Sequence, residues 1–203
     1  MFIKPLLKLF LYCLLSFSLA ASAHKMADYL VDIEENAHTE EVGYTAMIKE
    51  YDHNLEKTLL IKVIELKDNS GLVYLGGEVS STDLAPYLQH MKLLLNDDFV
   101  QYRQNQARRD HQTFHVTLVN PFEYRDLDQK NIQLDQSINI RLLGLGRVSK
   151  KDKNTFFVVV ESSQAQFYRQ RLALVNKDFH ITLGFNPQDI YGVSKGVDTL
   201  LDR

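Results

Sequence analysis

The chain has 203 residues, of which 45% are hydrophobic, and its 23 Lys and Arg against 26 Asp and Glu give a formal net charge of −3. A mildly acidic protein lacks the positive field that attracts long polynucleotides, so any nucleic-acid partner is expected to be short or gripped at its end. The single cysteine, Cys13, excludes a disulfide framework within the chain.

The first 23 residues predict a secretory signal peptide. Lys4 and Lys8 form a basic start, residues 9–19 form an apolar run, and Ala21-Ser22-Ala23 is a cleavage signal. A membrane-spanning helix is the alternative, but it needs about 20 consecutive apolar residues. We therefore expect an exported protein, periplasmic or secreted, with one domain over residues 24–203 that begins near His24.

Cleavage would change both the charge and the chemistry of the chain. It removes Lys4 and Lys8, which leaves 21 basic residues (23 − 2) against 26 acidic ones and a net charge of −5. It also removes Cys13, so the mature chain would have no thiol to act as a nucleophile or a metal ligand.

The first half of the mature chain alternates strands with one long helix. Residues 24–41 are acidic and partly helical, 44–51 and 58–66 predict strands, and a turn at 68–71 leads to a hairpin strand at 72–79. A helix is expected from Ser81 to about Arg109, with Pro86 in its first turn. Its core-facing residues recur at helical spacing: Leu84, Leu88, Met91, Leu95 and Phe99.

The second half repeats this order. Residues 122–136 form a polar connection, 137–148 and 155–160 predict strands joined by a turn at 150–154, and Ser162-Ser163 caps a helix to about Val175.

One five-residue frame occurs twice, as Phe114-His115-Val116-Thr117-Leu118 and as Phe179-His180-Ile181-Thr182-Leu183. Strict alternation of apolar and polar residues predicts half-buried strands. In a strand, residues i and i+2 share one face, so each copy presents an imidazole beside a hydroxyl. The alternative is that these His and Thr residues are ordinary polar residues on the solvent face of two amphipathic strands, but the repeat of the whole frame argues against it.

Each half therefore reads strand, strand, helix, His-x-Thr strand. We expect an α+β fold of two β-β-α-β lobes, an N-lobe over about 42–120 and a C-lobe over about 137–186, whose antiparallel sheets face a central cleft. A pseudo-twofold axis between the lobes would bring His115 and His180 face to face.

The spaced His-x-Thr pair resembles the two-histidine (2H) phosphoesterase superfamily, which includes RNA 2′,3′-cyclic phosphodiesterases and 2′-5′ RNA ligase-like proteins. This resemblance covers residues 44–195, and residues 179–195 look more narrowly like the 2H domain of Swiss Army Knife RNA repair-like proteins. It implies a phosphoric diester hydrolase that acts on cyclic phosphodiesters or on RNA and nucleotide ends.

The motif residues suit this chemistry directly. An imidazole titrates near pH 6.5, so His115 and His180 can divide the roles of general acid and general base. The hydroxyls of Thr117 and Thr182 can donate to the non-bridging phosphate oxygens. No cofactor or metal is expected, because the sequence has no clustered His, Asp and Glu motif, and a pair of histidines offers only two ligands.

Weaker candidates for substrate binding follow the motifs. Four aromatic side chains would either stack on a base or simply pack: Phe122, Tyr124, Phe185 and Tyr191. Asn186 followed by Pro187 predicts the start of a helix whose N–H groups point at phosphate near His180. Lys195 and Arg147 would add positive charge, whereas Arg108-Arg109 are expected only to complement the end of a helix.

Two other classes of function stay open at this point. The same fold would serve as a non-catalytic binding module for nucleotides or RNA ends, or as an exported scaffold. The expected partner is a small nucleotide or RNA end rather than a long nucleic acid or a membrane, and the expected state is a monomer.

Overall fold

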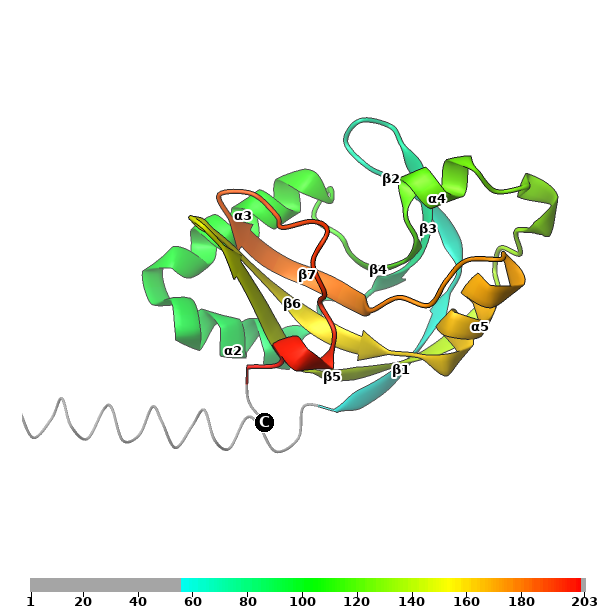
Figure 1. The fold of residues 1–203 in the computed structure, drawn as a ribbon. Coiled ribbons are helices and arrows are strands. Elements are labelled where there is room, and N and C mark those ends of the chain that lie inside the picture. The colour runs from blue at the N-terminus through cyan, green and yellow to red at the C-terminus, as the bar shows by residue number, and fades with distance from the viewer. Residues whose placement is uncertain (1–55, 202–203) are drawn as a thin grey trace, which may run out of the picture. The chain divides into compact units, whose positions relative to one another are not determined.

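The structure, a computed structural model, describes residues 56–201 (Figure 1). The expected signal peptide, the acidic segment 24–41 and the expected strand 44–51 lie outside these residues. The described part is an α+β fold built on one seven-stranded antiparallel sheet with the order β1-β5-β6-β7-β4-β3-β2. None of its helices has the length and apolar character needed to cross a bilayer.

Residues 56–201 contain seven strands and four α-helices. The strands are β1 (Lys57–Lys62), β2 (Ile64–Lys67), β3 (Val73–Val79), β4 (Phe114–Val119), β5 (Ser137–Lys150), β6 (Lys153–Glu161) and β7 (Phe179–Asn186). The α-helices are α2 (Ala85–Leu95), α3 (Phe99–Arg109), α4 (Pro121–Arg125) and α5 (Ser163–Arg171). Short 3-10 turns occupy η1 (Asn96–Asp98), η2 (Gln129–Asn131) and η3 (Val197–Thr199).

The strand predicted over 58–66 is divided at Val63, which is fully buried. Its N–H donates to the carbonyl of Gln136 at 2.9 Å, and its carbonyl accepts from the N–H of Asp135 at 2.8 Å. β1 pairs with β5, whereas β2 pairs with β3. Although only one residue separates β1 from β2 in the chain, the two strands stand at opposite ends of the strand order. The sheet must therefore curl back toward itself.

This continuous sheet corrects the expectation of two separate sheets facing each other across a cleft. The connectivity of the two halves does correspond: β3 leads through helices to its neighbour β4, and β6 leads through α5 to its neighbour β7. A pseudo-twofold axis between two lobes is not confirmed by this correspondence.

The helix predicted over 81–109 is instead two helices, α2 and α3, separated by η1. Asn96 has a φ of 45°, a left-handed conformation that ends α2. Pro86 does lie in the first turn, but the N-cap is Leu84, without a side-chain cap from Ser81, Thr82 or Asp83. The predicted apolar stripe faces the core, since Leu84 and Met91 are fully buried and the other three members pack against them.

The connection predicted as polar over 122–136 contains an unforeseen helix, α4. Asn120 caps it by accepting the N–H groups of Phe122 and Glu123, and the Glu123 carboxylate accepts the N–H of Asn120 in return. Arg169, buried in α5, donates to both Glu123 oxygens and to the carbonyl of Leu118. This contact fixes α4 at the end of the strand β4.

The second half follows its prediction more closely. β5 and β6 form the expected hairpin, and Ser162 caps α5 by accepting the N–H of Ala165 at 3.0 Å. α5 ends at Arg171 rather than at Val175, because the chain turns at Ala173, whose φ is 58°.

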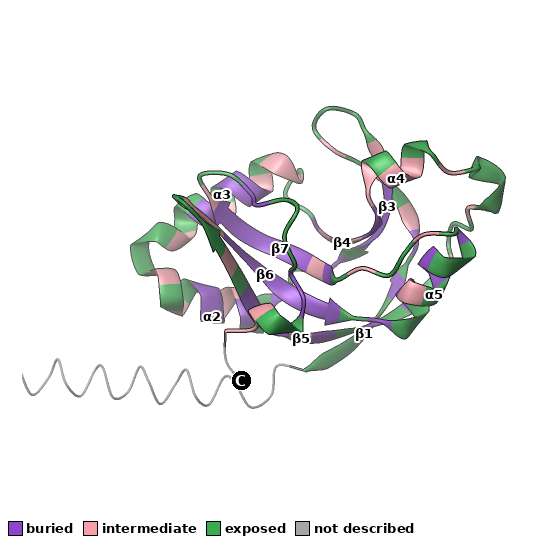
Figure 2. Ribbon diagram, viewed as in Figure 1, coloured by how far each residue is buried: buried purple, intermediate pink, exposed green. Residues whose placement is uncertain are grey.

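The strands β6 and β7 are buried along most of their length, as Figure 2 shows. The helices α2 and α3 pack directly on β7 at Gly184, where an added Cβ would lie 2.5 Å from Met91 Cε and 3.0 Å from Tyr102 Cβ. A larger residue than glycine would push these helices away from the sheet.

Candidate active site

The two motif strands, β4 and β7, are antiparallel neighbours at the centre of the sheet. Val116 of β4 lies directly opposite Ile181 of β7, and both side chains are fully buried in the core. The apolar sides of the two frames thus fill one core, and the motifs lie side by side in one sheet rather than on two facing sheets.

The same register places all four polar motif residues on the other face. Continued by one residue in each direction, this register would set His115 opposite Thr182 and Thr117 opposite His180. Directly opposed Cβ atoms are about 4.5–5.5 Å apart, and diagonal neighbours such as the two histidines are about 7–8 Å apart.

His115 has a phenol as its nearest polar partner. The Tyr74 hydroxyl lies 3.2 Å from His115 Nε2, and the two ring centroids are 5.4 Å apart. Burial raises the pKa of Tyr74 to about 12, and the charge of Asp110 acts in the same direction. Tyr74 is therefore a neutral O–H donor near pH 7. Burial lowers the pKa of His115 below its ordinary value, although Asp110 opposes this effect.

His180 has a cation as its partner instead. The Lys195 ammonium lies 3.4 Å from His180 Nε2, and the edge of the Phe157 ring packs on the imidazole with centroids 5.6 Å apart. Burial holds the pKa of His180 well below its ordinary value, and the Lys195 charge adds to this effect. In the free protein His180 is therefore neutral near pH 7.

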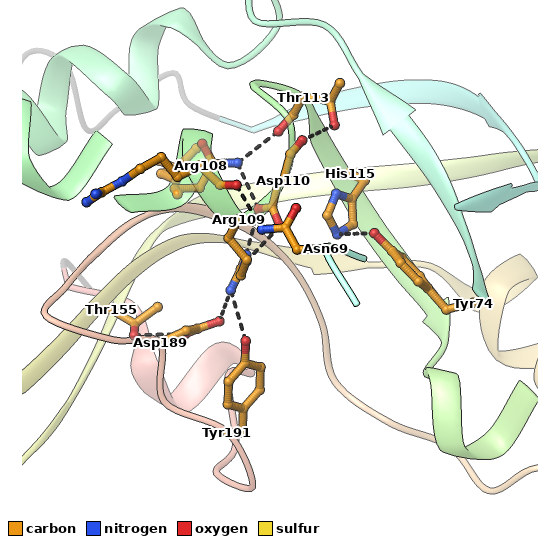
Figure 3. A network of polar contacts seen from close by, with 12 residues as sticks. Asn69, Tyr74, Arg108, Arg109, Asp110, Thr113, His115, Thr155, Asp189 and Tyr191 are labelled. Carbon is orange, nitrogen blue, oxygen red and sulfur yellow. Dashed lines mark hydrogen bonds and ion pairs between the residues drawn. The ribbon is translucent and has the colours of Figure 1, made fainter. Parts of the chain in front are cut away.

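A network of charged groups lies near the two histidines, and Figure 3 shows its members Arg109, Asp110 and Asp189 close to His115. The Arg109 guanidinium pairs with Asp110 at 2.7 Å through two nitrogens, and it also pairs with Asp189. Asp189 accepts from Lys195 at 3.0 Å and from the Thr155 hydroxyl at 2.9 Å. Burial acts to raise the pKa of Asp189, but Lys195 and Arg109 outweigh it and hold this pKa below its ordinary value.

Sequence reasoning missed most of this network. Arg109 ends α3, and its pairing with Asp189, 80 residues away, gives it a part beyond complementing the helix end. Tyr74, Thr155 and Asp189 had no signal of their own, because isolated polar residues in strands and loops are common. The one usable clue was that Asp189 and Lys195 follow the second motif closely.

Three of the weaker candidates lie close to this network. Phe185 is buried at the end of β7, and the Arg109 guanidinium stacks 4.9 Å from its ring centroid. Tyr191 is 71% exposed, and its hydroxyl accepts from Arg109 at 3.5 Å. Lys195 contacts His180 as described above. Tyr191 thus offers an exposed ring next to the network on which a base can stack.

The remaining candidates are placed differently. Tyr124 is engaged elsewhere, since its hydroxyl lies 2.5 Å from Glu65 and 3.0 Å from Gln129. Phe122 is exposed on α4, a helix that contacts β3, the strand of Tyr74. Arg147 is exposed, with its guanidinium 5.9 Å from the Phe156 ring centroid.

The expected helix after Asn186 is wrong. β7 runs through Asn186, whose amide oxygen accepts from the Asn105 amide at 3.4 Å, and residues 187–196 form an irregular tail with bends and no helix. No N–H groups of a helix start are therefore presented to His180 from this position. The positive charge near His180 comes from Lys195 instead.

Across residues 56–201, no group of three or more His, Cys, Asp or Glu side chains is arranged to hold a metal ion. Two imidazoles with two hydroxyls beside them, on adjacent strands of an α+β fold, are the arrangement expected of a two-histidine phosphoesterase.

Comparison with known families supports this class. The family described as "Swiss Army Knife, 2H phosphoesterase domain" matches residues 78–191, more than half of the chain. The chain belongs to this family of the 2H phosphoesterase superfamily. The matched span contains both motifs, Arg109 and Asp189, whereas Tyr74 and Lys195 lie just outside it.

Membership supports a phosphoesterase activity in general. Comparisons with curated proteins and with solved structures find no match.

Proposed function

We propose that this protein is an exported, metal-independent phosphodiesterase that hydrolyses cyclic phosphodiesters, in particular 2′,3′-cyclic phosphates of nucleotides or RNA ends. The observation that carries the proposal is the shared face of β4 and β7, where two His-x-Thr motifs lie diagonally opposed. The catalytic residues are His115 and His180, with Thr117 and Thr182 as donors to the phosphate.

The proposed reaction needs no group beyond these side chains and water. One neutral imidazole takes a proton from water, whose oxygen attacks phosphorus. The bond from phosphorus to the ribose 2′ or 3′ oxygen breaks, and the second imidazole, protonated, delivers its proton to that oxygen. The product is an acyclic phosphomonoester, and the threonine hydroxyls donate to the non-bridging oxygens throughout.

The charges around the site favour a diester over a monoester. Arg109 and Lys195 contribute two positive charges, and Asp110 and Asp189 contribute two negative charges, so the four cancel. Lys177, whose charge acts on His180, and Glu78, opposite His115 in β3, add one charge of each sign. A single protonated histidine then leaves one positive charge. This matches a phosphodiester, which carries one negative charge, better than a monoester, which carries close to two at pH 7.

The matching connectivity of β3–β4 and β6–β7 supports a further part of the proposal, a pseudo-twofold relation between two lobes that share the sheet. The proposed substrate is a small nucleotide or an RNA end, because a net charge of −3 does not attract a long polynucleotide. We also propose that the protein acts as a monomer.

The direct test is turnover of 2′,3′-cyclic AMP by the purified protein. We expect conversion to a 2′- or 3′-phosphomonoester, followed by phosphorus NMR, with the same rate in excess EDTA. Loss of activity with EDTA and its return with a divalent ion would refute the metal-independent mechanism.

A non-catalytic nucleotide-binding module is the alternative function, and one observation favours it. Burial lowers the pKa of both His115 and His180, whereas the proposed reaction needs one of them protonated. A bound phosphate restores that proton because its negative charge favours the imidazolium. Calorimetric binding of a cyclic nucleotide without any turnover would establish the binding module instead.

Export gives a separate expected result. In a host with a secretion pathway, the protein should be recovered outside the cytosol, with an N-terminus at or near His24. Mass spectrometry of the intact protein checks the site of cleavage. Full-length chain recovered in the cytosol with Met1 retained would contradict export.

A further inference from the structure

Lys195 is a buried ammonium held against one of the two histidines. Its side chain is 5% exposed, and that of its partner Asp189 is 3% exposed. Nζ donates to Asp189 at 3.0 Å and lies 3.4 Å from His180 Nε2. A buried lysine needs a compensating partner, and Asp189 provides it.

Asp189 fixes Lys195 from several elements at once. Its carboxylate accepts from Thr155 in β6, from Arg109 at the end of α3, and from Lys195 in the tail that follows β7. Figure 3 shows Arg109, Thr155 and Asp189 converging in this way. The ammonium is therefore held in one place beside the imidazole, which distinguishes it from a solvated surface lysine.

We propose that Lys195, held by Asp189, is a positioning residue that keeps His180 neutral as the general base and so leaves His115 as the general acid. This inference rests on the proposed function. An ammonium has only donors, so Nε2 can face it only through its lone pair. That is the form of the imidazole that accepts a proton from water.

The groups that face the two histidines are different. His180 meets Lys195, Arg109 and Lys177 as cations, and the Asp189 carboxylate opposes their effect. His115, on the adjacent strand β4, meets Asp110 and Arg109 together with the Tyr74 hydroxyl.

These surroundings give the two histidines different protonation behaviour. Burial lowers the pKa of both. The largest charge effect at His180 comes from Lys195 and adds to burial, with Asp189 opposing it less, whereas the largest at His115 comes from Asp110 and opposes burial, with Arg109 acting the other way less strongly. When phosphate binds, the proton therefore goes to His115 first.

The contact acts mainly through charge. A separation of 3.4 Å between the two nitrogens is longer than an ordinary hydrogen bond. The effect of Lys195 on His180 is then electrostatic and persists during the reaction.

The test compares Lys195→Met with Lys195→Arg and with Lys153→Met as the matched control. Lys153 donates to Gln188 in the same tail at 2.8 Å, so its loss removes one charge and one tail contact without touching His180. NMR titration of the His180 ring in the full chain is the first readout. The midpoint should move to higher pH in Lys195→Met and stay in place in the other two variants.

The pH dependence of kcat/KM for 2′,3′-cyclic AMP is the second readout. On the acidic side of this profile, kcat/KM falls as the general base becomes protonated. In Lys195→Met this fall should occur at higher pH, so kcat/KM should drop by about tenfold or more below neutral pH. Lys195→Arg should keep the wild-type profile on the acidic side. A purely structural role would lower the rate at every pH alike.

Two outcomes would overturn the proposal: an unchanged His180 titration in Lys195→Met, or a shift of His115 in place of His180. If Lys195→Met fails to fold, the double variant Lys195→Met with Asp189→Asn removes both buried charges and is titrated instead. The NMR readout needs no substrate. A wild-type protein without turnover therefore refutes the proposed function alone and leaves the Lys195 inference to be judged by titration.

Discussion

Replacing His115 or His180 by alanine is expected to lower kcat/KM for a cyclic phosphodiester by about 10²–10⁴-fold in each case. In the proposed reaction the two imidazoles divide one task, since the first removes a proton from water and the second delivers a proton to the leaving oxygen. Neither threonine hydroxyl can replace them, because its proton is too tightly held. Steady-state kinetics of both variants, with circular dichroism to verify folding, measures the effect.

His111→Ala is the matched control, because this exposed histidine lies in the turn between α3 and β4, four residues from His115. We expect its kinetics to equal those of the wild type. Thr117→Ala and Thr182→Ala should lose less activity than the histidine variants, since each removes one donor among several. A histidine variant with wild-type activity would contradict the paired acid and base.

The motif strands could be predicted from sequence because their signal is local. Alternation with period two fixes which side chains share a face, and both frames are strands in the structure with buried apolar faces. Sequence alone also indicated the hairpins, the cap at Ser162 and the apolar stripe from Leu84 to Phe99. Each of these depends on residues within a few positions of one another.

The features that were missed depend on contacts between distant parts of the chain. The break at Val63 exists because its backbone bonds with Asp135 and Gln136 as β1 and β2 part to opposite ends of the sheet. The break at Asn96 gives the long apolar pattern two helices instead of one. Hydrophobic spacing records that a residue faces the core, but not that the chain changes direction there.

The candidate site shows the same contrast between local signals and contacts between distant parts of the chain. The sequence identified the four motif residues, yet the partners that set their protonation come from other elements: Tyr74 from β3, Arg109 from α3 and Lys195 from the tail. A repeated motif reveals the residues proposed for chemistry, whereas the charges that tune them depend on the fold. The roles of the two histidines are consequently a structural question.

Arg169→Met is expected to destabilise the protein by about 3 kcal/mol, because it removes the buried member of an ion pair together with its bonds to two carbonyls. The Arg169 side chain is 1% exposed, and it donates to both oxygens of Glu123 and to the carbonyls of Leu118 and Val175. Methionine fills the space but leaves two carbonyls and a carboxylate without their donor. Urea unfolding followed by circular dichroism measures the loss, and the release of α4 should also weaken activity.

The exposed pair of Arg125 and Asp126 supplies the control, since their side chains are 73% and 71% exposed. Arg125→Met should change the free energy of unfolding by less than about 1 kcal/mol. Acid adds a second measure. Burial acts to raise the pKa of Glu123, but Arg169 and the Asn120 N–H outweigh it, so this pKa lies below its ordinary value.

A carboxylate with a lowered pKa contributes stability above its ordinary pKa and loses it as the pH falls through the lowered value. Without Arg169 the pKa of Glu123 rises. Ionised Glu123 then contributes less to stability at neutral pH, and acid removes this smaller contribution at a higher pH. Unfolding midpoints measured between neutral and acidic pH should therefore converge for wild type and Arg169→Met as Glu123 becomes protonated. Parallel curves for the two proteins would show that Glu123 is not the partner that Arg169 stabilises.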